Sequence, residues 1–293
     1  MIGMTESRKR LLVLGANGML GNTVLRWFAS DPAYIVVGSV RRAESVRALE
    51  ASQPGACFVE GIDACDLPAL RRLFAEVKPD VVINCIGVVK QLAGADAPAV
   101  AIPINALLPH RLARLSQACG ARFVHISTDC VFTGARGAYS ELDVPDAVDL
   151  YGRSKLMGEV DYANAVTLRT SIIGHELSTS HALLGWFLAQ EGAVSGFTNA
   201  LFSALPTVEL ARVIQGFVLP NVGLRGTYHV AGPTISKHDL LRMVARVYGR
   251  RNPIIAEPLP VLDRSLNAGR FQAATGYTAP SWDEMDARMH AFG

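Results

Sequence analysis

A tyrosine and a lysine that stand four residues apart could carry out acid chemistry together. In Tyr151-Gly-Arg-Ser-Lys155 the phenol and the ammonium share one face if the segment is helical. A free tyrosine has a pKa of about 10, so it acts as an acid near neutrality only if a neighbouring cation lowers that pKa by roughly 3. The spacing therefore predicts that Tyr151 donates a proton with the help of Lys155. An ordinary exposed pair on a helix has the same spacing and stays the alternative.

Thr128 is the third residue that we expect at this site. It lies in Ser127-Thr128-Asp129, directly after the apolar run Phe123 to Ile126. Ligands of α/β folds bind at the carboxyl ends of parallel strands. We expect the Thr128 hydroxyl to hydrogen bond a substrate carbonyl while Tyr151 supplies a proton and a nicotinamide supplies hydride. The alternative is that Thr128 only caps a turn or a helix.

A glycine-rich segment indicates where the nicotinamide cofactor would bind. Gly15-Ala-Asn-Gly18-Met-Leu-Gly21 follows the apolar run Leu11 to Leu14 and opens a helical pattern. Glycines permit a tight turn between strand and helix, and they let a pyrophosphate approach the amides at the positive end of the helix dipole. The segment therefore predicts a dinucleotide site, with a tight turn that binds nothing as the alternative.

The end of the second predicted strand favours NADP(H) over NAD(H). An acidic residue usually lies about 20 positions after the glycine loop, where it binds the ribose hydroxyls. This chain has instead Gly38-Ser39-Val40-Arg41-Arg42. A guanidinium there can pair with a ribose 2′-phosphate through two hydrogen bonds. We therefore predict NADP(H), with NAD(H) still possible, and a solvated arginine pair at the start of the next helix as the alternative.

Short apolar runs and amphipathic stretches alternate through the first part of the chain. The strand-like runs are Leu11 to Leu14, Ile35 to Val40, Val81 to Ile83 and Phe123 to Ile126. The helix-like stretches are Leu20 to Ala29, Leu67 to Val77 and Leu107 to Ala118. This alternation predicts an α/β fold with a doubly wound parallel sheet.

After about residue 170 the alternation loosens and prolines divide the chain into shorter pieces. Helices are still expected at Thr207 to Leu219, Lys237 to Tyr248 and Trp282 to His290. We expect a dinucleotide-binding domain over 1–170 and a smaller substrate-binding lobe over 171–293, with some segments of the second part returning to the first domain.

Composition excludes several other classes. Of the 293 residues, 50% are hydrophobic and 18% charged, as in a folded globular chain, and a net charge of +2 without a long basic tract makes nucleic acid an unexpected partner. The five cysteines form no CxxC pair and the seven histidines no HExxH, so we predict no metal site and a core role for His125. The polar start, Met1 to Arg10, and the short apolar runs predict a cytoplasmic protein without a membrane segment.

Several motifs occur in the order in which one known family carries them. They are Gly15 to Gly21, Asn84-Cys-Ile-Gly87, Asn105, His125-Ile-Ser-Thr-Asp129 with Val131-Phe132, Tyr151 to Lys155 and Leu168-Arg-Thr-Ser171. Over these first 170 residues the chain resembles the extended branch of the short-chain dehydrogenase/reductase superfamily, which acts on nucleotide sugars. The spacing is most similar to that of the dTDP-4-dehydrorhamnose reductases.

This resemblance implies a Rossmann-type domain with a C-terminal lobe and an NADPH-dependent reduction of a nucleotide-linked 4-keto-6-deoxy sugar. Tyr151 would be the proton donor, Lys155 would hold the nicotinamide ribose and lower the pKa of the phenol, and Thr128 would orient the keto group. The implied cofactor-binding residues are Gly15, Asn17, Gly18, Met19, Leu20, Gly21, Ser39, Arg41, Arg42, Asp63, Ala64, Cys85, Ile86, Gly87, Asn105, Ser127, Tyr151 and Lys155. The implied substrate residues are Thr128, Asp129, Cys130, Ile172, Asn199 and Arg264.

The chain also departs from the pattern of these reductases. Cys130 stands where they commonly have tyrosine, Ile172 stands where they commonly have an aromatic residue, and the segments Val88-Val-Lys-Gln91 and 197–203 differ as well. The sugar and its nucleotide therefore stay open. So do two other functions: a nucleotide-sugar epimerase or dehydratase, and a non-catalytic NADP-binding regulatory subunit such as the beta subunit of methionine adenosyltransferase. Relatives are often dimers, so a homodimer is one expectation.

Overall fold

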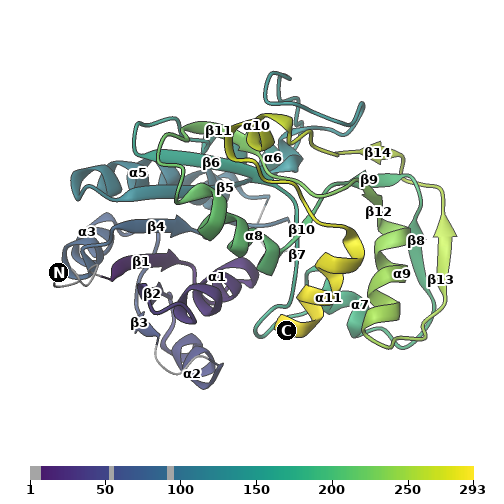
Figure 1. Cartoon of the computed structure of the whole chain (residues 1–293), viewed down its shortest axis with the longest axis horizontal. Coiled ribbons are helices and arrows are strands. Elements are labelled where there is room, and N and C mark those ends of the chain that lie inside the picture. Colours follow the sequence, from purple (N-terminus) through teal and green to yellow (C-terminus); the bar gives the residue numbers. More distant parts are fainter. Residues whose placement is uncertain (1–7, 53–55, 91–95) are drawn as a thin grey trace, which may run out of the picture.

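A seven-stranded parallel sheet forms the centre of the molecule (Figure 1). The computed structural model describes residues 8–52, 56–90 and 96–293; Gln91 and most of the polar N-terminal stretch, 1–7, lie outside this part. From one edge to the other the strands are β11 (Gly226–His229), β6 (Ala165–Thr170), β5 (Arg122–Thr128), β4 (Val81–Asn84), β1 (Lys9–Leu14), β2 (Tyr34–Ser39) and β3 (Cys57–Val59). Their order reverses between β4 and β1, which confirms the predicted doubly wound fold. In open α/β sheets ligands usually bind at the carboxyl ends of the strands beside such a reversal.

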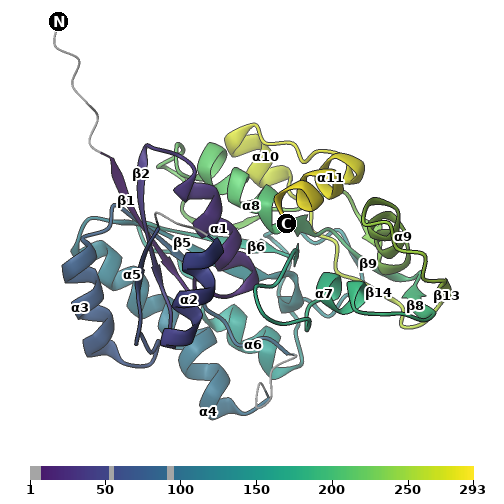
Figure 2. The ribbon, with the colours of Figure 1, turned by 90° about the horizontal axis from the view of Figure 1, so that it is seen from below.

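Helices cover both faces of the sheet (Figure 2). Alternate residues of β1 point to opposite sides, so Leu11 and Val13 belong to one core cluster while Leu12 and Leu14 belong to another. The first cluster lies under α1 (Met19–Ala29) and α8 (Thr207–Val213); the second lies under α3 (Leu67–Val77) and α5 (Leu108–Ala118). All four of these β1 side chains are fully buried, and each contributes about 1.5–3 kcal/mol through burial.

The predicted helices of the first part are present, with additions. Helix α3 matches its expected bounds because Asp66 caps its start and Lys78, with a positive φ of 48°, ends it. The helix predicted from Leu107 begins earlier, as α4 (Pro98–Ala101) and a π-helical segment, η1 (Ile102–Leu107), that runs into α5. A helix after the arginine pair was considered only as an alternative, and it is present as α2 (Ala43–Ser52); the short strand β3 was not predicted.

The second part of the chain builds a smaller lobe beside the sheet, on the right in Figure 1. Its short strands are β8 (Val194–Phe197) paired with β13 (Ile254–Glu257), and β9 (Ala200–Phe202) between β12 (Ile235–Ser236) and β14 (Leu262–Asp263). Helices α7 (Leu183–Leu188) and α9 (Lys237–Val247) pack with them. A further pair, β7 (Ile172–Ile173) with β10 (Leu205–Pro206), lies near the main sheet.

Several late segments return to the first domain. Strand β11 extends the main sheet beside β6, and α8, which continues into a π-helical segment, η3 (Ile214–Val218), packs on α1. Helix α10 (Gly269–Thr275) contacts β11, and α11 (Trp282–Phe292) contacts both α8 and α9. The domain boundary expected near residue 170 stays a prediction.

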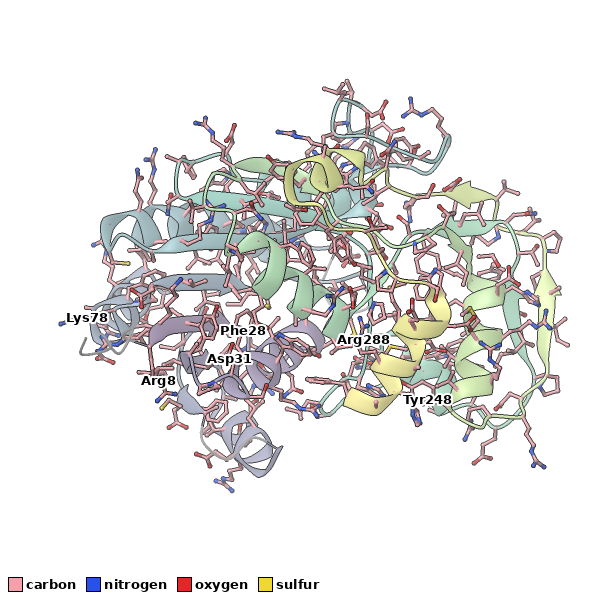
Figure 3. The ribbon with its side chains drawn as sticks, viewed as in Figure 1. Arg8, Phe28, Asp31, Lys78, Tyr248 and Arg288 are labelled. Atoms are coloured by element: carbon pink, nitrogen blue, oxygen red, sulfur yellow. The ribbon has the colours of Figure 1, made fainter. Side chains whose placement is uncertain are left out.

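A buried carboxylate joins these late helices. Glu209 of α8 is fully buried and is paired with Arg212 at 2.6 Å and with Arg288 of α11. The Tyr277 hydroxyl also donates to it, at 3.0 Å. Figure 3 shows Arg288 on α11, facing α8, and Tyr248 at the end of α9. This cluster therefore holds α8, α11 and the segment around Tyr277 together.

Candidate active site

The glycine loop between β1 and α1 makes a turn that two of its glycines require. Gly15 has a φ of +79°, which side chains rarely adopt, and a Cβ there would lie 3.0 Å from the Ile86 side chain. A Cβ on Gly21 would lie 2.1 Å from the Gly15 carbonyl oxygen. These two residues therefore allow the close packing of helix α1 on the loop, whether or not a ligand binds.

Gly18 has no such structural reason to be glycine. Its φ is −78°, and a Cβ there would meet only the Gly15 oxygen, at an ordinary 3.4 Å. Gly18 begins α1 without a side-chain cap, and the first turn of α1 holds no acidic residue. The helix amides that follow, at Met19 and Leu20, therefore suit an approaching pyrophosphate. Asn17 is exposed beside them, and its amide donates to Ser45 of α2 at 3.4 Å.

The second wall of the predicted cofactor site is the end of β2. Ser39 is buried, and its carbonyl accepts the Ala16 amide at 3.1 Å, which fixes this wall to the glycine loop. Arg41 and Arg42 are exposed, and neither guanidinium group has a hydrogen bond or ion pair within the described ranges. Two unpaired guanidinium groups at this point fit a 2′-phosphate.

Asp63 and Ala64 lie next to this wall. The Ile62 amide donates to the Val40 carbonyl at 3.1 Å, so the segment runs beside the end of β2. The Asp63 carboxylate is occupied by the Cys65 amide at 2.8 Å. The structure thus places these two predicted cofactor-binding residues beside the strand end that leads into the two arginines.

The third wall follows β4. The Cys85 amide donates to the Leu14 carbonyl at 3.0 Å, which brings Cys85, Ile86 and Gly87 beside the glycine loop. A Cβ on Gly87 would meet only the Asn105 amide oxygen, at 3.6 Å, so this glycine also leaves open space. Burial raises the pKa of the Cys85 thiol to about 12, partly offset by the charge of Lys155, so the thiol is neutral.

Asn105, in η1, acts on this wall through its side chain. The amide accepts from the Val88 backbone N–H at 2.9 Å and donates to the Val88 carbonyl at 3.0 Å. It also donates to the Ser154 hydroxyl at 3.2 Å, on α6 (Leu150–Met157). Asn105 therefore holds the wall after β4 against the helix that carries Tyr151 and Lys155.

Lys155 extends from α6 to the central strand β5. Its ammonium donates to the Ile126 carbonyl at 2.7 Å, and only 5% of the residue is exposed. Burial lowers the pKa of Lys155 to about 8, although the negative charge of Glu159 acts in the opposite direction. The predicted lysine is thus fixed beneath the carboxyl end of β5, two residues before Thr128.

Tyr151 and Thr128 meet at the same end of the sheet. Burial and the neighbouring Cys130 raise the pKa of the Tyr151 phenol above its usual value, while a hydrogen bond with Thr128 acts to lower it. Thr128 also donates to Asp129 and accepts the Cys130 amide, each at 3.1 Å, so the expected turn cap is present as well. The expected lowering of the Tyr151 pKa by Lys155 is not found: the pKa is raised by burial, and Lys155 is not among the groups that act on it.

Some of the predicted substrate residues lie around this trio. Asp129 and Cys130 follow Thr128 directly, and burial raises the pKa of both side chains while the charge of Arg264 lowers it. Arg264 donates to the Phe132 carbonyl at 2.9 Å, which brings the end of β14 to the site. The structure does not bring Asn199 to the trio by a hydrogen bond: its amide donates to the Pro258 carbonyl at 3.0 Å, within the small lobe.

Ile172 lies on β7, half-buried against the main core. The role of this residue and of the other predicted site residues stays a prediction.

A buried ion pair beneath the site was not expected from sequence. Arg169 of β6 makes two hydrogen bonds to Glu159, at 2.7 and 2.6 Å, and Ser127 donates to the same carboxylate at 2.8 Å. Both charged side chains are less than 10% exposed. Ser127, predicted to touch the cofactor, therefore binds this carboxylate. A charged residue inside an apolar strand, Arg169, was the one available signal.

His125 has the core role that its strand predicted. It is fully buried, and its Nδ1 lies 3.2 Å from the Asn84 amide nitrogen. Burial lowers its pKa far below the usual value, so the ring is neutral. Within 8–52, 56–90 and 96–293 no three metal-ligating side chains lie together, and no helix is long and apolar enough to cross a membrane.

The sequence of this chain also matches the model of a known protein family. The family model described as RmlD substrate binding domain matches residues 9–275. The chain belongs to this family. The predicted membership in the extended short-chain dehydrogenase/reductases is thereby confirmed, and at this level the chain is an NAD(P)-dependent oxidoreductase of the sugar-nucleotide reductase and epimerase type.

Two curated relatives differ in what they are described to do. A probable low-salt glycan biosynthesis reductase of Haloferax volcanii is 31% identical over 95% of this chain and 96% of its own length. The methionine adenosyltransferase 2 subunit beta of Rattus norvegicus is 30% identical over 89% of this chain and 79% of its own length. The matched relatives thus include one described as a reductase and one described as a subunit of another enzyme.

Solved structures share the fold at lower identity. The dTDP-4-dehydrorhamnose reductase of Bacillus anthracis, solved with NADP, has a TM-score of 0.76 at 20% identity, covering 97% of this chain and 99% of that one. The UDP-Glc/GlcNAc 4-epimerase of Campylobacter jejuni has a TM-score of 0.74 at 14% identity, covering 97% and 98%. The fold alone thus does not separate a reductase from an epimerase.

Alanine at Gly18 should weaken NADP binding, whereas alanine at Gly21 should lower the stability of the fold. Gly18→Ala adds a methyl group where only ordinary contact exists, so we expect stability within about 1 kcal/mol of wild type and NADP affinity at least about tenfold lower. Gly21→Ala places a Cβ 2.1 Å from an oxygen and should cost about 1–3 kcal/mol of stability. Urea denaturation and fluorescence titration with NADP measure both quantities. Unchanged NADP affinity in Gly18→Ala would contradict the proposed pyrophosphate position.

Proposed function

We propose that the chain reduces a nucleotide-linked 4-keto-6-deoxy sugar with NADPH. The observation that carries this proposal is the meeting of Thr128, Tyr151 and Lys155 at the carboxyl end of β5, beside an uncapped glycine loop. The described functions of the Haloferax and Bacillus relatives, a glycan biosynthesis reductase and a dTDP-4-dehydrorhamnose reductase, support the same reaction class.

Residues on three walls would hold the dinucleotide. The loop at Gly18 would take the pyrophosphate, Arg41 and Arg42 the 2′-phosphate, and the segment 85–87 would lie along the nicotinamide half. The open space at Gly18 and Gly87 fits such a ligand, since neither glycine is required by protein packing. When bound, NADPH supplies a hydride to the substrate carbonyl carbon.

The chain's own residues then handle the proton. The Tyr151 phenol is protonated near neutral pH, and its oxygen can donate this proton to the carbonyl oxygen. Its raised pKa makes proton loss costly, so the donation needs a nearby positive charge that favours the phenolate. The Thr128 hydroxyl would hydrogen bond the same carbonyl oxygen and orient it. The Lys155 ammonium, held by Ile126, would bind the nicotinamide ribose and favour the phenolate that forms once the proton has left.

Cys130 argues against a dehydratase. Eliminating water needs an acid and a base beside the sugar. Burial raises the pKa of the Cys130 thiol to about 11, so this side chain stays neutral near pH 7 and is a poor base. The observation favours a reductase or an epimerase over a dehydratase.

A non-catalytic regulatory role is the second candidate, supported by the similarity to the methionine adenosyltransferase beta subunit. An isolated regulator would bind NADP without consuming it. The reductase proposal includes three further expectations: residues 171–293 bind the substrate, the protein forms a homodimer, and it is located in the cytoplasm.

Tyr151→Phe should separate catalysis from cofactor binding. The variant loses the proton donor but keeps the ring, so we expect turnover to fall by about 100-fold or more with NADPH affinity unchanged. The assay follows NADPH absorbance and product identity with a panel of dTDP- and UDP-linked 4-keto sugars. Wild-type protein that binds NADPH but reduces no member of the panel would favour regulation, and product formed without net NADPH loss would favour an epimerase.

The arginine pair should set the choice of dinucleotide. Removing both guanidinium groups in Arg41→Ala/Arg42→Ala should lower kcat/KM with NADPH about 10- to 100-fold and leave kcat/KM with NADH nearly unchanged, because charged hydrogen bonds contribute about 1.5–3 kcal/mol. Arg71→Ala/Arg72→Ala, on α3, is the matched control, since these two arginines are also adjacent and exposed. Equal losses with both dinucleotides would remove the assignment to the 2′-phosphate.

Turnover should depend on the protonation of Lys155. This pKa is about 8, so kcat should be constant below that value and fall as the pH rises through it, because the ammonium loses its charge. Glu159→Gln removes a charge that raises the pKa of Lys155 and should move the fall to lower pH. Circular dichroism checks folding of this variant. A kcat that stays constant up to pH 10 would show that the charge of Lys155 is not needed.

A further inference from the structure

Lys90 lies at the catalytic end of the crevice, in a segment that the sequence marked only as a departure from related reductases. Its ammonium is 2.8 Å from Oδ2 of Asp149. The other oxygen of that carboxylate, Oδ1, accepts the Gly152 amide at 2.8 Å and caps the start of α6. One carboxylate therefore connects the segment after β4 to the first turn of the helix that carries Tyr151.

The same ammonium also faces the phenol ring. The Lys90 Nζ lies 5.5 Å from the centroid of the Tyr151 ring, within the distance at which a cation is attracted to the ring face. The charge of Lys90 also lowers the pKa of the neighbouring Cys130 thiol. Lys90 thus faces the phenol ring from the segment after β4, whereas Lys155 extends from α6 itself.

Exposed ion pairs contribute little to stability in general, and here the Lys90 and Asp149 side chains are 39% and 40% exposed. The effect of this ion pair would be on the position of the Tyr151 phenol. Tyr151 is the second residue of α6, so a change in how Asp149 is held moves the phenol directly. Proton transfer depends steeply on position, and a displacement of about 1 Å can cost about 100-fold in rate.

We infer that Lys90 is a positioning residue for Tyr151, acting through Asp149 and through the face of the phenol ring. This inference rests on the proposed function, in which Tyr151 donates the proton. Lys90 contributes by holding the start of α6 at a fixed place, and its positive charge favours the phenolate left behind by proton transfer.

The test compares variants of the full chain. Lys90→Met removes the charge and keeps the length of the side chain, whereas Lys90→Arg keeps both charge and pairing. Asp149→Asn keeps an oxygen that can cap Gly152 but loses its charge. Lys237→Met, at the start of α9 in the small lobe, is the matched control.

We expect Lys90→Met and Asp149→Asn each to lower kcat about 10- to 100-fold, with KM for NADPH and for the sugar nucleotide within about twofold. The double variant should lose no more than either single variant, because both break the same connection. Lys90→Arg should retain most of the activity. An unchanged kcat, additive losses, or a rise in sugar-nucleotide KM alone would overturn the inference, the last by making Lys90 a substrate contact.

A second readout does not depend on turnover. The ¹³Cζ resonance of Tyr151, assigned by its loss in Tyr151→Phe, reports the surroundings of the phenol. It should shift in Lys90→Met and in Asp149→Asn but not in Lys237→Met. If wild-type protein reduces no keto sugar, the proposed function fails while this resonance still tests the positioning. An unchanged resonance in both variants would overturn it.

Discussion

The hydrogen bond from the Lys155 ammonium to the Ile126 carbonyl connects the helix α6 to the central strand β5. This buried hydrogen bond places the positive charge of Lys155 near the carboxyl end of the sheet. Burying that charge is costly, and the lowered pKa of Lys155 reflects this cost. Glu159, itself held by Arg169 and Ser127, offsets part of it. The position of Tyr151, one turn earlier on α6, follows from this contact.

The packing of α6 is adapted to the same constraint. A Cβ on Gly152 would lie 2.3 Å from the Cys130 carbonyl oxygen, and a Cβ on Gly158 would lie 1.9 Å from the Asn105 carbonyl oxygen. These two glycines let the helix approach the turn after β5 on one side and η1 on the other. Asn105 adds a side-chain hydrogen bond to Ser154 in the same contact. The helix is thus fixed at both ends, which keeps the phenol close to Thr128.

Much of the main domain could be predicted from sequence because its signals are local. The central strands are apolar runs, and α3 begins at a capping aspartate, Asp66. Other elements carry weaker signals: β3 has three residues, and β11 reads Gly-Thr-Tyr-His. The helical extension before α5 was not predicted, and it contains two prolines, a residue type that usually interrupts helices. Pro98, Pro103 and Pro109 each lie in the first turn of their own segment, where a proline is tolerated.

The residues of the candidate site also fall into those that the sequence could identify and those that it could not. Thr128, Tyr151 and Lys155 could be found because their spacing and their place after a strand are visible in the chain. Glu159 and Asp149 could not, because their partners come from other elements: Arg169 lies on β6, and Lys90 stands 59 positions before Asp149. Such contacts exist only once the sheet has formed. For Asn199 the sequence predicted a substrate contact, but the structure shows a hydrogen bond from its amide to the Pro258 carbonyl within the small lobe.

The relatives of this chain include a protein described as a probable glycan biosynthesis reductase and one described as the beta subunit of methionine adenosyltransferase 2. The most direct measurement uses NADPH that carries deuterium at C4 of the nicotinamide, incubated with the protein and a nucleotide-linked 4-keto-6-deoxy sugar. The account predicts one deuterium on C4 of the sugar for each NADP formed, detected by mass spectrometry and NMR. Label that remains on the nicotinamide, in protein that binds NADPH, would contradict it.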